Sequence, residues 1–84
     1  MGAITIQRVR FNIYPNDHDP PHVDAEVDGM KMKIFFGSSS KPPEIGLMNP
    51  RIKRNDAKRA FQIFLDNEET LKTLYKEVHG KAIE

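Results

Sequence analysis

A strictly alternating run on both sides of Asp28-Gly29 constrains the fold of this chain more than any other feature. Apolar and polar residues alternate through residues 22–28 and again from Met30 to Ile34, which is typical of strands with one buried face, and the second strand is expected over residues 30–36. An Asp-Gly pair between two such runs favours a two-residue hairpin turn. We therefore expect an antiparallel hairpin in which lysines of the second strand stand opposite acids of the first.

A strand is also expected before the hairpin, over about residues 3–14. Ile4 and Ile6 fall on the opposite parity from the later apolar positions, so we expect a bulge or bend near Gln7 if they are buried too. The three predicted strands would build one buried face from Val9, Phe11, Ile13, Val23, Ala25, Val27, Met32 and Ile34.

The second half of the chain is predicted to be a loop followed by helix. Gly, Ser and Pro mark residues 37–50 as a loop, within which residues 44–48 can add a short edge strand. Apolar residues then recur at helical spacing over about 55–66 and 68–79, with Asn55 or Asp56 as the first cap. The expected buried stripes are Ala57, Ala60, Phe61, Phe64 and Leu65, and then Leu71, Leu74, Tyr75 and Val78. The prediction is one α+β domain over residues 1–84, with a three- or four-stranded antiparallel sheet and one or two C-terminal helices packed on one face.

Composition narrows the functional classes only a little. The chain of 84 residues has no cysteine, so disulfides and thiolate metal sites are excluded. A formal net charge of +1 does not indicate a partner by itself. No apolar run approaches the roughly 20 residues that span a bilayer, and the amino terminus does not resemble a signal peptide. We expect a cytoplasmic protein without membrane contact.

The joint between the first strand and the hairpin, residues 14–24, is the candidate site. It contains two of the three histidines and three of the six prolines, and adjacent prolines make it stiff. His18 and His22 are the candidate catalytic residues, and Asp17 and Asp24 are candidate binding residues.

Three interpretations of the joint remain open. A metal site would use His18, His22 and Asp24, but an extended Pro-Pro segment separates the two histidines by roughly 12 Å, so no metal ligands are assigned. An acid–base enzyme acting on a phosphodiester would use one histidine oriented by a neighbouring carboxylate. In the third interpretation, which asks least of the sequence, the histidines and aspartates hold the loop in shape for a binding module.

A basic cluster precedes and begins the first predicted helix. Its members are Arg51, Lys53, Arg54, Lys58 and Arg59. Cations on one helical face can contact phosphates without reading sequence, so nucleic acid is a possible partner. The alternative is a solvated helix start.

The run Asn-Asp-His-Asp-Pro-Pro-His at residues 16–22 resembles the signature of a family of short bacterial proteins, domain of unknown function 4160. The similarity extends over most of the chain, although Asp24 stands where the family generally has a second histidine. The resemblance implies an α+β fold and a link to toxin–antitoxin-like gene pairs, because such genes often lie beside a gene for another small protein. It implies no established reaction and no cofactor.

The functional prediction is a small interaction module of a toxin–antitoxin-like pair, which binds a protein partner or a second copy of itself. The alternative is a small histidine-dependent nuclease or metal-binding hydrolase with its site at His18, His22 and Asp24. Whether the protein is an enzyme is left open.

Overall fold

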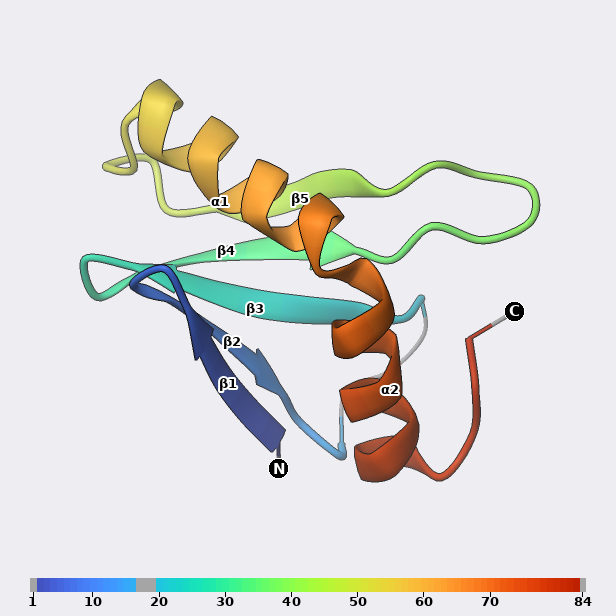
Figure 1. Cartoon of the computed structure of the whole chain (residues 1–84). Coiled ribbons are helices and arrows are strands. Elements are labelled where there is room, and N and C mark those ends of the chain that lie inside the picture. Colours follow the sequence, from blue (N-terminus) through green and yellow to red (C-terminus); the bar gives the residue numbers. More distant parts are fainter. Residues whose placement is uncertain (1, 17–19, 84) are drawn as a thin grey trace.

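A computed structural model describes residues 2–16 and 20–83. The chain forms a five-stranded antiparallel sheet in which each strand pairs with the next along the chain, followed by two helices (Figure 1). The elements are β1 (Gly2–Ile6), β2 (Val9–Ile13), β3 (His22–Val27), β4 (Met30–Phe35), β5 (Glu44–Met48), α1 (Arg54–Asp66) and α2 (Glu68–His79). No helix in the described part of the chain is long and apolar enough to cross a membrane.

The sheet has five strands instead of the expected three or four. The single strand expected over residues 3–14 is wrong, because β1 and β2 form a hairpin in which Ile6 pairs with Val9. Gln7 and Arg8 make the turn with φ angles of 50° and 71°. Opposed residues of an antiparallel pair share a face, so a two-residue turn explains the change of parity that suggested a bend.

The fifth strand lies within residues 37–50 and confirms the short edge strand that residues 44–48 were expected to add to this loop segment. β5 pairs with β4, and the register shifts between Met32 and Ile34, where β5 carries an extra residue. A bulge of this kind protects an edge strand from pairing with other chains. Leu47 lies in the irregular part of β5 and is 84% exposed.

Both helices cover the same face of the sheet, and the core lies between them and the strands (Figure 1). All eight residues predicted for the inner face of the sheet are buried. The other buried apolar residues are Phe36, Ile52, Ala57, Ala60, Ile63, Phe64, Leu71 and Tyr75.

The first helix differs from its prediction in two respects. It begins at Arg54, with Lys53 as N-cap and without a side-chain cap, so neither Asn55 nor Asp56 caps it. Its buried stripe includes Ile63, whereas Leu65 is 38% exposed. The buried side of α1 is therefore turned slightly about the helix axis from the predicted side, toward Ile63 and away from Leu65.

Because consecutive strands are antiparallel neighbours, the connections alternate between two ends of the sheet. We call one the turn end, which carries residues 7–8, residues 28–29 and the segment 49–53 before α1 (left in Figure 1). The other is the loop end, which carries residues 14–16, residues 20–21 and the segment 36–43 (right in Figure 1). α2 also lies at the loop end.

Candidate functional site

The predicted joint lies at the loop end, and the structure describes part of it. Tyr14 to Asn16 and Pro20 onward are placed, whereas Asp17, His18 and Asp19 lie outside the described residues. The candidates Asp17 and His18 therefore have no described geometry. The hydrogen bond from the Phe36 amide to the Pro21 carbonyl (3.1 Å) joins the end of the joint to the end of β4.

His22 begins β3 and is buried on the face of the sheet opposite the helices. Its ring is 7% exposed and meets the ring of Phe35, its partner in β4, edge-on at 5.9 Å. Nδ1 lies 3.0 Å from the carbonyl oxygen of Pro20. Since a carbonyl oxygen can only accept, Nδ1–H is the donor in this bond. The imidazole thus packs on the sheet and fixes the proline segment.

Asp24 lies on the same face as His22, two residues along β3. In the register of the sheet it stands between Asn12 of β2 and Lys33 of β4. Asn12 is 2% exposed and donates through Nδ2 to Glu26 Oε1 at 3.3 Å. Within the described residues, no three His, Asp or Glu side chains are grouped as a metal site would require.

A pocket of about 490 Å³ opens at the loop end beside this joint. Within the described residues, four separate segments of the chain line it. They contribute Pro20 and Pro21; Phe35, Phe36, Gly37, Ser38, Lys41, Pro42 and Glu44; Tyr75; and Lys81, Ala82 and Ile83. Phe36 belongs to the core and Phe35 is half-buried, and both contribute to the lining of the pocket.

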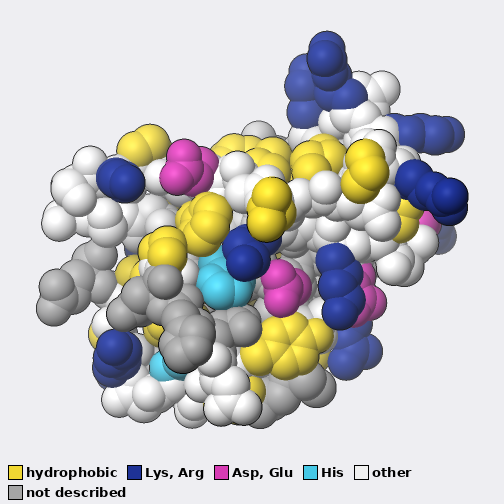
Figure 2. Space-filling view, turned by 180° about the vertical axis from the view of Figure 1, so that it is seen from behind, with side chains coloured by type: hydrophobic (Ala, Val, Ile, Leu, Met, Phe, Trp, Pro, Cys, Tyr) yellow, Lys and Arg dark blue, Asp and Glu magenta, His cyan; other side chains and the backbone are white. Residues whose placement is uncertain are grey.

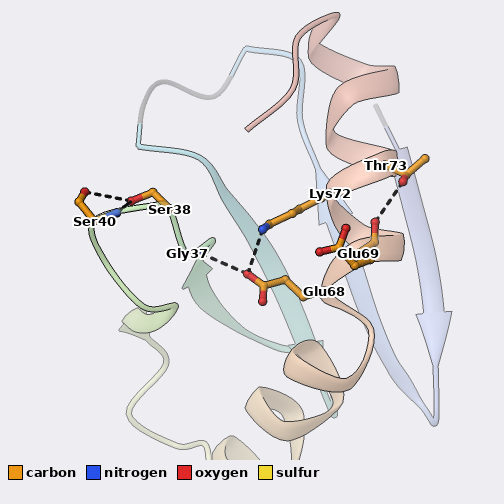
Figure 3. Close-up of polar contacts among 7 residues, drawn as sticks. All are labelled: Gly37, Ser38, Ser40, Glu68, Glu69, Lys72 and Thr73. Carbon is orange, nitrogen blue, oxygen red and sulfur yellow. Dashed lines mark hydrogen bonds and ion pairs between the residues drawn. The ribbon is translucent and has the colours of Figure 1, made fainter. Parts of the chain in front are cut away.

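Polar contacts fasten one wall of the pocket to α2. The Gly37 amide donates to Glu68 Oε2 at 3.3 Å, and Lys72 lies 3.9 Å from the same oxygen (Figure 3). The Ser38 amide donates to the Lys41 carbonyl at 2.8 Å, which closes the loop on itself. No linear motif marks this pocket, because its walls meet only in the folded chain.

The basic cluster lies at the turn end, so the structure does not bring it beside His22. All five of its residues are exposed. Arg59 Nη1 donates to the carbonyl oxygen of Gln7 at 3.2 Å, which places the middle of α1 against the β1–β2 turn. Figure 2 shows Lys and Arg side chains gathered toward one end of the sheet's outer face.

Comparison with known proteins identifies the family. The sequence model described as domain of unknown function (DUF4160) matches residues 8–76, and the chain therefore belongs to this family. Neither the curated proteins nor the solved structures yielded a match.

Proposed function

We propose that this member of the DUF4160 family is a small interaction module that binds a protein partner through the pocket at the loop end. The pocket carries the proposal: its volume of about 490 Å³ lies within the range of roughly 300–1,000 Å³ typical of small-molecule sites, which is room for a few side chains of a partner. Prolines and aromatic rings line it, and such rigid side chains lose little conformational entropy when a partner binds.

The chemistry of the lining suggests what kind of segment would fit. Among the described lining residues, half-buried Phe35 offers apolar ring surface, while Lys41 and Lys81 contribute two positive charges against one carboxylate, that of Glu44. A partner segment with an apolar side chain next to an acidic one would satisfy both features. The apolar contact would supply affinity and the charges would orient the segment.

We propose further that the partner is the small protein encoded beside this chain, as in a toxin–antitoxin-like pair of the bacterial cytoplasm. The resemblance stated above supports this step, since genes of the family often have such a neighbour.

The alternative, a histidine-dependent nuclease at His18, His22 and Asp24, receives less support from the geometry. General acid–base catalysis requires an imidazole within reach of the substrate. His22 is 7% exposed and its Nδ1 bonds to Pro20. The cations that would hold a phosphodiester lie at the opposite end of the sheet.

Co-expression with the protein encoded by the adjacent gene tests the proposal. We expect the two chains to co-elute as one complex in size-exclusion chromatography with light scattering. Pro42→Asp and Ala82→Asp alter exposed pocket residues, so they should weaken the complex at least about tenfold without unfolding the chain.

Leu47→Asp is the matched control, because it places the same carboxylate on an exposed apolar residue outside the pocket. It should leave the complex intact. A complex that survives both pocket variants, or that Leu47→Asp alone disrupts, would contradict the proposed site.

A further inference from the structure

We infer that the turn end is a second binding surface, which takes the phosphate backbone of duplex nucleic acid. The first observation in favour of this inference is the distribution of arginine residues. All five arginines of the chain lie at this end, whereas only three of the eight lysines do. The eight residues, called the basic surface below, are Arg8, Arg10, Lys31, Arg51, Lys53, Arg54, Lys58 and Arg59.

Hydrogen bonds hold the three segments of the basic surface side by side. The bond from Arg59 to the Gln7 carbonyl joins α1 to the β1–β2 turn. The Asn49 amide donates to the Lys31 carbonyl at 2.9 Å, and the Arg51 amide donates to Asn49 Oδ1 at 2.8 Å. Residues 8–10, the start of β4 and residues 51–59 are therefore one surface of the folded chain.

Charge is separated between this surface and the remainder of the molecule. Three acids, Glu26, Asp28 and Asp56, lie at the turn end with the eight cations, which gives a formal charge of +5. The other residues sum to −4, because the whole chain carries +1. A local field of this sign attracts polyanions although the net charge of the chain is close to zero.

The cations of the basic surface are available to a ligand. All eight are exposed. In the described part of the chain, the ion pair found joins Lys72 to Glu68 at the other end, and none involves the basic surface. Arg10 and Arg59 each use one N–H group in a hydrogen bond within the chain, which leaves the rest of each guanidinium open.

The N-terminus of α1 adds a second, independent feature within this surface. No side chain caps it, and a cation, Lys53, occupies the N-cap position. Cations next to the positive end of a helix dipole are repelled by it. A phosphate bound there would accept from the uncapped amides and offset that repulsion.

Several observations favour duplex nucleic acid over other anions. The planar arginine fork suits phosphate oxygens, and the arginines are spread over two segments that meet along one end of the sheet. Such a spread fits a row of phosphates better than a single one. All seven aromatic side chains are buried or half-buried, so no exposed ring is offered for base stacking, on which single-strand binders rely.

Fluorescence anisotropy of the full chain with labelled duplexes of about 20 base pairs would test this inference. We expect binding that does not depend on sequence, with a log–log salt slope of about −4 for four to five phosphate contacts. The triple variant R51E/R54E/K58E should weaken binding at least about 30-fold at low salt. The experiment is run with a DNA duplex and with an RNA duplex, and binding to either one supports the inference.

The matched control is K41E/K76E/K81E, which makes the same change in charge at exposed lysines of the loop end. It should change duplex affinity less than about threefold, and circular dichroism melting should show both triples folded. Equal losses in both triples, no duplex binding at low salt, or capture of anionic vesicles but not duplexes would overturn the inference. The test is independent of the proposed protein partner, since the control triple alters the pocket and the test triple does not.

Discussion

The turn end and the loop end of the same sheet have opposite characters. Two-residue turns and all five arginines are found at the turn end. Longer connections, five of the six prolines and the pocket of about 490 Å³ are found at the loop end. The turn end therefore presents positive charge on short, exposed connections, whereas the loop end presents a pocket with apolar surface.

The difference shows how a sheet of consecutive antiparallel strands can separate two kinds of surface. Such a topology collects every second connection at the same end, so residues distant in sequence become neighbours. Gln7 and Arg59 meet in this way at the turn end, as do Pro21 and Phe36 at the loop end. Each end can then change its surface residues without altering the strands between them.

The largest loss of stability is expected from a substitution of Phe36, which lies in the core at the loop end. Phe36 is 7% exposed, and its ring lies 5.3 Å from that of Phe64 and 5.6 Å from that of Tyr75, so it joins the sheet to both helices. Phe36→Ala should lower the free energy of unfolding by about 3–4 kcal/mol, measured by urea denaturation.

Phe61→Ala provides the comparison for Phe36→Ala. Phe61 is half-buried and stacks on Phe64 at a centroid distance of 6.2 Å. Its truncation should cost about 1–2 kcal/mol. Equal losses at the two positions would mean that Phe36 does not connect the layers as described.

A smaller loss of stability is expected at His22, and it would test whether this residue has a structural role in the joint. His22→Ala removes a buried ring packed on Phe35 and a hydrogen bond to the Pro20 carbonyl, and should lower the free energy of unfolding by about 1–2 kcal/mol. His22→Phe keeps the ring but not the donor, so its unfolding free energy should lie between those of the alanine variant and the native chain. Unchanged stability in both variants would favour a chemical role for the imidazole over a structural one.

Strand pairing and the inner face could be predicted from sequence because each depends on local alternation. The hairpin around Asp28-Gly29 and the eight inward residues of the sheet are examples. The β1–β2 turn was missed because Gln7 and Arg8 are not residues that favour positive φ. Their only signal was the change of parity at Ile6, which a bulge explains equally well.

The two proposed surfaces were harder to predict. The cluster at residues 51–59 is visible in sequence, but Arg8, Arg10 and Lys31 join it only through the order of the strands. Four segments of the described chain line the pocket, and no spacing within any one of them indicates its presence. The local sequence pattern predicts individual strands and helices, whereas these two surfaces depend on which ends of the strands and helices lie together in the folded chain.

The smallest change in stability is expected from substitutions in two similar turns at the turn end. Asp28-Gly29 and Gln7-Arg8 are both two-residue turns with positive φ, but the second position is Gly29 (78°) in one and Arg8 (71°) in the other. An arginine in this region is strained, so Arg8→Gly should raise the free energy of unfolding by about 0.5–1 kcal/mol in urea denaturation. The same variant should weaken duplex binding about threefold or more, because it removes one cation of the basic surface. Gly29→Arg is the reciprocal change and should lower stability by a similar amount. If Arg8→Gly stabilises the chain without any loss of duplex affinity, the strained arginine does not serve the basic surface, and the contrast between the two turns has no functional meaning.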